Sequence, residues 1–145
     1  MARWIDVAVD DTHARFALQD DLAPQTAAAL WDALPLSASL RHSTRCGEAC
    51  SAEFSTPALA ALPERPEVFA ASIYKGWLAV RSSPPQTLGE IVISYGLAEY
   101  RTATGRQQIT PLAELVGDGE ALFAALQRTH TEGEKTLHIR PAASQ

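Results

Sequence analysis

The 145-residue chain is 46% hydrophobic and 20% charged, and its 17 acidic and 12 basic residues give a formal charge of −5. These values are typical of one globular domain with a real core, and they exclude a disordered or fibrous chain. The acidic balance disfavours nucleic acid and an anionic membrane surface as partners, and no apolar run approaches the roughly 20 residues that cross a bilayer. Met1 leads into a strand-like segment and not into a signal peptide, so we expect a cytoplasmic protein.

The first third of the chain predicts a β-hairpin followed by a helix. Residues 4–9 and 14–18 alternate in the manner of half-buried strands. We expect a helix over residues 24–34, because Pro24 suits a first helical turn and Pro35 ends a helix. The apolar stripe of this helix, at positions i, i+3, i+4 and i+7, consists of Ala27, Leu30, Trp31 and Leu34.

Most of the remaining segments predict short strands. Strand patterns occur over residues 40–46, 48–54, 77–80, 90–95, 97–102 and 135–140. Helical patterns occur over residues 58–62, over residues 110–116, where Thr110 and Pro111 look like a helix start, and around Leu122, Phe123 and Leu126. The chain is therefore predicted to be mainly β, a closed or nearly closed β-barrel with helical plugs. We expect one domain over residues 1–140 and a tail over residues 141–145.

Four short motifs follow one another along the chain. They contain Ala23, Pro24, Thr26, Leu34 and Pro35, then His42, Cys46, Gly47, Glu48 and Ala49, then Lys75, Gly76, Trp77 and Leu78, and last Glu90, Ile91, Tyr95, Gly96, Tyr100, Thr102 and Gly105. In this order they resemble an uncharacterised bacterial family with a cyclophilin-like fold, which also supplies the cyclophilin-like domain of cucumopine synthase. The resemblance covers residues 4–117 and implies a small barrel with a pocket on one side.

The chain also departs from the pattern of that family. Arg45 stands where the family usually has a tryptophan, and the third motif lacks its proline and its glutamate. We therefore expect the pocket to be adapted to a ligand different from that of the typical member.

His42 and Glu48 are the first candidates for proton transfer. Their spacing of six places both on one face of an unbroken strand, although a bulge at Gly47 would change that register. An imidazole and a carboxylate that meet can act as a proton-transfer pair, whereas the simpler alternative is a surface strand with polar side chains. Tyr95 is the third candidate, as a proton donor, and it would otherwise be a core tyrosine on the face of Ile91.

Arginine side chains are the natural anchors for a substrate carboxylate, because the guanidinium binds it in a bidentate manner. The strand arginines that could do so are Arg41, Arg45, Arg81 and Arg101. Arg45 is the strongest candidate, since it lies in the motif between His42 and Glu48, and Arg101 is also predicted to bind substrate. Any one of the four would alternatively be a rim residue or a cross-strand partner. The remaining predicted binding residues are Cys46, Tyr74 and Glu90.

Glu90 is a separate candidate acid or base, on the strand face opposite to Tyr95. Cys46 is either a nucleophile with a lowered pKa or a small buried residue. A strand would separate Cys46 and Cys50 by about 13 Å, beyond the roughly 7 Å limit of a disulfide, so we expect both thiols to be reduced. His13, His130 and His138 are expected on the surface without partners.

These residues predict a small-molecule enzyme that performs acid–base chemistry on an amine- or carboxylate-bearing metabolite. No metal or nucleotide cofactor is expected, because the sequence lacks a ligand cluster, a P-loop and a G-x-G-x-x-G motif. The resemblance to the cucumopine synthase domain implies ring closure between an amine and a carbonyl compound. In that scheme Glu48 or His42 removes a proton, Tyr95 donates one and Arg45 holds a carboxylate.

Other functions stay open at the level of sequence. An isomerase or lyase step would use the same groups. A non-catalytic small-ligand-binding module is the main alternative, and residual peptidyl-prolyl isomerase activity is a weaker one. A homodimer is compatible with the strand edges and Trp4, but no sequence feature requires it.

Overall fold

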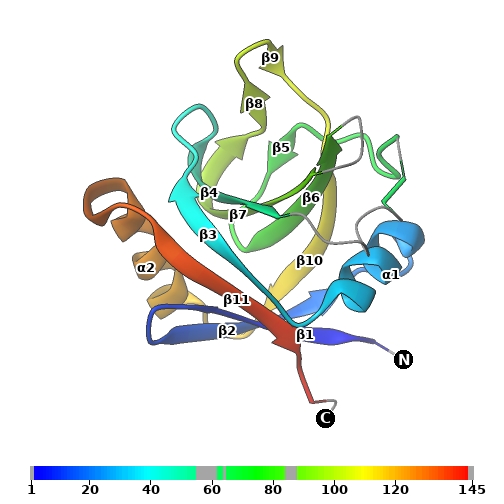
Figure 1. The fold of residues 1–145 in the computed structure, drawn as a ribbon, viewed down its shortest axis with the longest axis horizontal. Coiled ribbons are helices and arrows are strands. Elements are labelled where there is room, and N and C mark those ends of the chain that lie inside the picture. Colours follow the sequence, from blue (N-terminus) through cyan, green and yellow to red (C-terminus); the bar gives the residue numbers. More distant parts are fainter. Residues whose placement is uncertain (1, 55–61, 64, 84–87, 144–145) are drawn as a thin grey trace.

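Eight antiparallel strands close into a barrel in the computed structural model of the protein, which describes residues 2–54, 62–63, 65–83 and 88–143 (Figure 1). The order around the barrel is β4-β3-β11-β1-β2-β10-β6-β7, and β7 pairs with β4 to complete the circle. The strands are β1 (Trp4–Val9), β2 (Thr12–Leu18), β3 (Leu36–His42), β4 (Gly47–Phe54), β5 (Ser72–Ile73), β6 (Trp77–Ser83), β7 (Leu88–Glu99), β8 (Arg101–Thr102), β9 (Gly105–Arg106), β10 (Thr110–Val116) and β11 (Lys135–Pro141).

The barrel interior holds the main hydrophobic core. Alternate residues of each strand point inward, as Ile5, Val7 and Val9 of β1 do, and all three are fully buried. The helices α1 (Pro24–Ala33) and α2 (Glu120–Glu132) lie on opposite sides of the barrel and add buried side chains to the same core (Figure 1). The predicted hairpin, both of these helices and the mainly β barrel are therefore confirmed.

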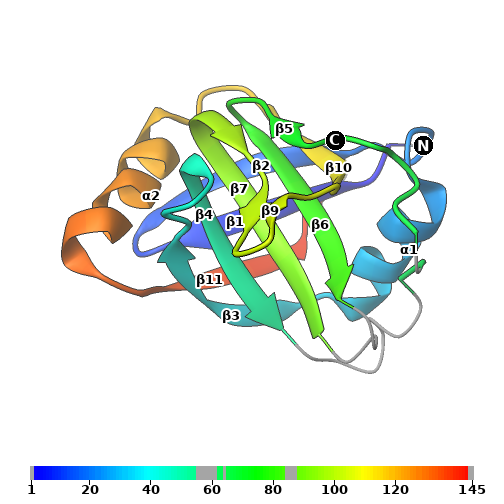
Figure 2. The ribbon, with the colours of Figure 1, turned by 90° about the horizontal axis from the view of Figure 1, so that it is seen from above.

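A second buried cluster lies on the outer face of β4, β6 and β7. Its inner layer comes from these strands, and its covering side chains include Ile73, Tyr100 and Ile109. Figure 2 shows β5 and β9 over this face of the barrel. Because β7 is covered on both faces, its run Ile91, Val92 and Ile93 is fully buried, although consecutive strand residues point in opposite directions.

Residues 110–116 form a strand, so the helix predicted there is wrong. Thr110 and Pro111 do resemble a helix start, but this segment pairs with β2 on one side and with β6 on the other. The barrel would stay open without β10. The proline lies where the ladder shifts register between Pro111 and Ala113, a place where a missing N–H group costs little.

The predicted strand over residues 40–46 is also placed wrongly. The strand β3 ends at His42, and residues 43–46 form the turn into β4, so that His42 pairs with Cys50. The six-residue spacing of His42 and Glu48 therefore spans a turn and not a strand. The irregularity anticipated at Gly47 is present, because the ladder between β4 and β7 shifts register between Gly47 and Ala49.

Gly96 does not interrupt the sheet as expected, because β7 continues through it to Glu99. A Cβ atom at Gly96 would lie only 2.6 Å from the carboxyl carbon of Glu48, so the glycine makes room for that side chain. Residues 58–61 of the helical turn predicted over residues 58–62 lie outside the described residues. No helix in the described ranges is both long and apolar enough to cross a membrane.

Gly47 gives a test of the turn that leads into β4. Its φ is +99°, and a Cβ atom there would lie 2.7 Å from the backbone oxygen of Leu97, whereas Gly117 has a φ of +82° with open space around it. Gly47→Ala combines backbone strain with a clash, so we expect it to lower the free energy of unfolding by about 3 kcal/mol. Gly117→Ala adds strain alone and should cost about 1 kcal/mol. Equal losses in urea denaturation would contradict this account.

Candidate functional site

A polar groove of about 500 Å³ lies on the outer face of the barrel. We call it the arginine groove after the four arginines in its lining. Its charged and aromatic side chains are Arg41, Arg45, Arg81, Arg101, Glu53, Glu90, Tyr100 and His42. Four guanidinium groups face two carboxylates, whereas the chain as a whole has a formal charge of −5. The groove is therefore locally positive and suited to an anionic ligand.

Three charged residues form a row across neighbouring strands on this outer face. Glu90 of β7 lies directly opposite Glu53 of β4 on one side and Arg81 of β6 on the other. Like charges opposite each other destabilise a sheet, so repulsion between Glu53 and Glu90 lowers the stability of this part of the barrel. Arg41 offsets part of that repulsion by binding Glu53 at 3.2 Å, and Arg81 lies opposite Glu90 on its other side.

Tyr100 holds Glu90 in place. Its hydroxyl group donates a hydrogen bond to Oε2 of Glu90 and accepts one from Nη1 of Arg81 at 3.4 Å. The guanidinium of Arg81 also lies over the Tyr100 ring, 5.6 Å from its centroid. Burial and the contact with Glu90 raise the pKa of Tyr100, so its hydroxyl keeps its proton and remains a donor. Glu90 thus presents a carboxylate of fixed orientation to the groove.

Arg45 is the predicted anchor, and it is exposed in the lining of the groove. Among the residues that the structure describes, Arg45 makes no ion pair, whereas Arg101 binds Glu99 at 3.0 Å. An arginine without a carboxylate partner keeps its bidentate donors for a ligand. The structure therefore brings four predicted residues into the lining of one groove, which are His42, Arg45, Glu90 and Arg101.

A neighbouring groove of about 470 Å³ contains four of the predicted binding residues, Arg45, Cys46, Tyr74 and Arg101. Two of these, Arg45 and Arg101, line both grooves. Cys46 is 4% exposed, and its Sγ contacts the backbone nitrogen and oxygen of Arg101 at 3.4 and 3.6 Å. The thiol therefore fixes the backbone at Arg101. Both cysteines are free, as expected.

His42 and Tyr95 meet on the inner side of the sheet. Nε2 of His42 lies 2.7 Å from the hydroxyl oxygen of Tyr95. Burial, together with the neighbouring His130, lowers the pKa of His42, so its neutral form is favoured. Burial raises the pKa of Tyr95, and the charges of Cys50 and Glu48 add to that effect. Nδ1 of His42 is buried and has no hydrogen-bond partner among the described residues.

Glu48 is exposed beside this pair and lies over Gly96. Its Oε1 accepts a hydrogen bond from the backbone N–H of Leu97 at 3.2 Å. Six of the predicted residues thus fall into two groups, whereas Cys46 and Tyr74 lie in the neighbouring groove. In the first group, Glu48 and Tyr95 lie near His42. The second group, Arg45, Glu90 and Arg101, lies in the arginine groove. His42 also contributes to the lining of that groove.

Sequence reasoning missed two contributors to these sites, His130 and Tyr100. His130 is exposed, as expected, but it was expected without a partner, and its ring centroid lies 4.8 Å from that of His42. The local signal was that it follows the buried Leu126 of α2 by four positions. Tyr100 was not proposed as a site residue, and Arg81 was considered only as one of several strand arginines, because their meeting at Glu90 depends on strand pairing. Within the described part of the chain, no three His, Cys, Asp or Glu side chains gather as a metal site requires.

Solved structures that share the fold of the chain include the following three. The structure of McbB in complex with tryptophan has a TM-score of 0.73 and 14% identity, and it covers 97% of this chain and 45% of McbB. The hypothetical protein AF2241 from Archaeoglobus fulgidus has a TM-score of 0.61 and 15% identity, covering 97% of this chain and 95% of its own. The cyclophilin-type peptidyl-prolyl cis-trans isomerase cgd2_1660 from Cryptosporidium parvum has a TM-score of 0.58 and 11% identity over 100% of both chains.

At these identities the likeness shows the fold, and it confirms the predicted cyclophilin-like barrel. The chain spans less than half of the length of McbB. The comparison with curated proteins gives no match. The family model described as "Protein of unknown function (DUF3830)" matches residues 5–140, from β1 to β11. Because that match spans the whole barrel, the chain belongs to the DUF3830 family.

Proposed function

We propose that the protein is an enzyme that binds an amine- and carboxylate-bearing metabolite in the arginine groove and performs acid–base chemistry on it. One observation carries this proposal: Glu90 is held by the buried Tyr100 in the same groove as Arg45 and Arg101. The arginines would bind the substrate carboxylate, and the two glutamates of the groove would attract its ammonium group. An oriented carboxylate next to a fixed substrate is a general base.

The reaction that fits best is a ring-forming condensation. The amine nitrogen adds to the carbonyl carbon of a second compound, and water leaves to give an iminium ion. An aromatic carbon of the first substrate attacks the iminium carbon and forms the new C–C bond. Glu90 then accepts the proton from the attacked ring position, which restores the aromatic ring. An isomerase or lyase step at an acidic carbon would use the same groups.

Two comparisons support this choice of substrate. McbB, whose structure contains tryptophan, has the same fold, and tryptophan carries an amine, a carboxylate and an aromatic ring. The resemblance to the cyclophilin-like domain of cucumopine synthase, seen in the sequence motifs, points to the same type of condensation. Since McbB is 14% identical and more than twice as long, its ligand guides the choice of probe only.

His42, Tyr95 and Glu48 form a second part of the proposal. The 2.7 Å contact between Nε2 of His42 and the hydroxyl of Tyr95 is short enough for proton transfer. His42 also contributes to the lining of the arginine groove, so the pair adjoins the outer site. We propose that this pair delivers or removes the second proton that a condensation requires.

Replacement of Glu90 by glutamine tests the catalytic part. We expect Glu90→Gln to lower turnover by at least about 100-fold, because the amide cannot accept the proton. Tryptophan binding should weaken by no more than about tenfold, because Glu53 still attracts the ammonium group. The measurement is product formation from tryptophan and a set of aldehydes and 2-oxo acids, followed by mass spectrometry. Tryptophan binding by the unaltered protein without consumption of any partner would identify a binding module and contradict the enzyme.

Replacement of Arg45 tests the carboxylate anchor. Loss of a charge-assisted hydrogen bond costs about 1.5 to 3 kcal/mol, so Arg45→Gln should weaken tryptophan binding by about 10- to 100-fold in calorimetry. Arg128→Gln is the matched control, because Arg128 lies on α2 and pairs with Glu132. Equal affinity in both variants would remove Arg45 from the site.

The lowered pKa of His42 predicts how stability depends on pH. The unfolded chain takes up this proton near pH 6.5, whereas the folded protein resists it. The unfolded state therefore binds more protons, and the stability present above pH 6.5 is lost as the pH falls toward the lowered pKa. We expect the loss of unfolding free energy between about pH 7.5 and 5 to be smaller in His42→Gln than in the unaltered protein. His13→Gln, at an exposed position of β2, should keep the full loss.

A further inference from the structure

The neighbouring groove, of about 470 Å³, carries two large apolar side chains that are exposed to solvent. Leu97 is 84% exposed and Tyr74 is 72% exposed, and no other large apolar side chain of the described residues is as exposed. Both belong to the lining of this groove. Large apolar side chains that are exposed side by side mark an interaction site.

The backbone that carries these two side chains is fixed by hydrogen bonds. The N–H group of Leu97, a residue of β7, donates to Oε1 of Glu48 at 3.2 Å. The carbonyl oxygen of Tyr74 accepts hydrogen bonds from the hydroxyl group of Ser94 and, at 3.1 Å, from the backbone N–H group of Trp77. A partner that binds here therefore orders only side chains, which lowers the entropy loss on binding.

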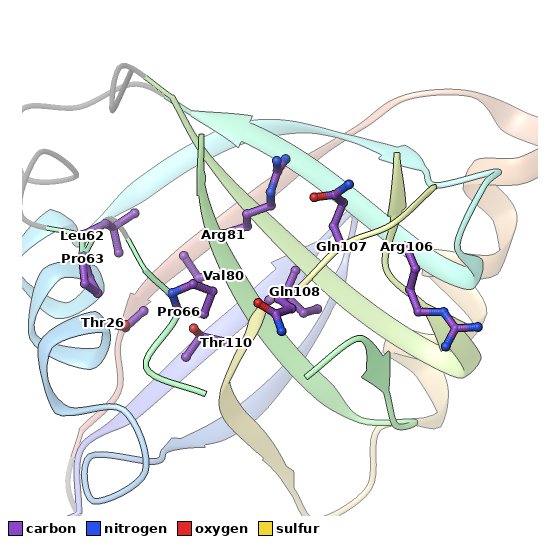
Figure 3. A pocket seen from close by; sticks show the side chains of 11 residues that line it. Thr26, Leu62, Pro63, Pro66, Val80, Arg81, Arg106, Gln107, Gln108 and Thr110 are labelled. Atoms are coloured by element: carbon purple, nitrogen blue, oxygen red, sulfur yellow. The ribbon is translucent and has the colours of Figure 1, made fainter. Parts of the chain in front are cut away.

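Arginines surround this apolar pair. Arg45 and Arg101 line the groove, and Arg106 lies opposite Arg101 in the β8–β9 hairpin. Figure 3 shows the Arg106 side chain apart from the residues beside α1, with its guanidinium turned away from them. Glu99 is the one carboxylate in the described lining, and it already binds Arg101 at 3.0 Å and Arg106 at 3.6 Å. The surface around the apolar pair is therefore positive.

We propose that the neighbouring groove binds a short acidic segment of a partner protein that carries a large apolar side chain. This side chain lies between Leu97 and Tyr74, and Asp or Glu residues beside it pair with Arg45 and Arg101. A groove of this volume accommodates a few side chains of an extended segment and not a folded domain. The segment would bind whether or not the proposed reaction takes place, and it would lie beside the arginine groove, which shares both arginines.

Charge and shape favour an acidic peptide over a nucleic acid. The formal charge of −5 repels a polyphosphate strand, whereas a peptide with a few carboxylates needs only the local arginines. Single strands bind by stacking successive bases on aromatic rings. Tyr74 is the one aromatic side chain in the described lining, and Leu97 offers no ring for a second base.

Selection from a random peptide library displayed on phage tests the proposal. We expect the selected peptides to combine Asp or Glu with Leu, Phe or Trp. The best peptide, synthesised with a fluorescent label, is then the probe in polarisation titrations. Leu97→Ser and Tyr74→Ser should each weaken its binding by about tenfold or more. Arg101→Gln should weaken it by about three- to tenfold, and the affinity of the unaltered protein should fall as salt is added.

Two variants outside the groove are the controls. Leu22→Ser changes an exposed apolar side chain just before α1, and Arg128→Gln changes an exposed arginine of α2. Both should bind the peptide as the unaltered protein does, and melting temperatures verify that every variant is folded.

Three results would overturn the proposal. The first is a selection that yields no binder, or binders without enrichment of Asp and Glu. The second is a peptide that binds Leu97→Ser as tightly as the unaltered protein, because it uses another surface. The third is an oligouridylate that binds the unaltered protein and not Tyr74→Ser, which would identify nucleic acid as the occupant.

Discussion

Pairing between β4 and β7 is the contact on which the site depends. It closes the barrel, and it fixes which side chains of both strands point outward. Glu53 and Glu90 become direct neighbours through this pairing, and Arg81 joins them through the ladder between β6 and β7. The resulting row concentrates charge on a face that the second apolar cluster otherwise covers. Tyr100 offsets part of the repulsion between Glu53 and Glu90 by donating a hydrogen bond to Glu90.

The wall of the barrel separates two kinds of polar chemistry. Tyr95 and Glu90 are five positions apart on β7, so they point to opposite faces. On the inner side, Tyr95 and His42 share a contact in a partly buried environment that disfavours charge. On the outer side, arginines and glutamates remain in reach of solvent. The His42–Tyr95 pair and the charged residues of the arginine groove therefore lie on different faces of the sheet.

Local patterns were sufficient for the hairpin, for both helices and for the strand β11. Each of these elements has a period of two or 3.6 residues that a single segment displays. Thr110 and Pro111 show where local reading fails, because the need for a strand between β2 and β6 outweighs a helix-start pattern. The same limit applies to the site. The contacts among Arg81, Glu90 and Tyr100 depend on strand register. The contact between His42 and His130 depends on how α2 packs against the barrel. Neither can be read from a single segment of the sequence.

The antiparallel pairing of β1 with β11 brings both chain ends to one end of the barrel, where Ile5 faces Pro141. In Figure 1 these ends lie at the bottom of the molecule, whereas the turn between β3 and β4 and the β8–β9 hairpin lie at the top. Anchoring the protein to a support through either end would therefore leave the groove facing the solution. A tag or a fused partner at one end would also be close to the other end.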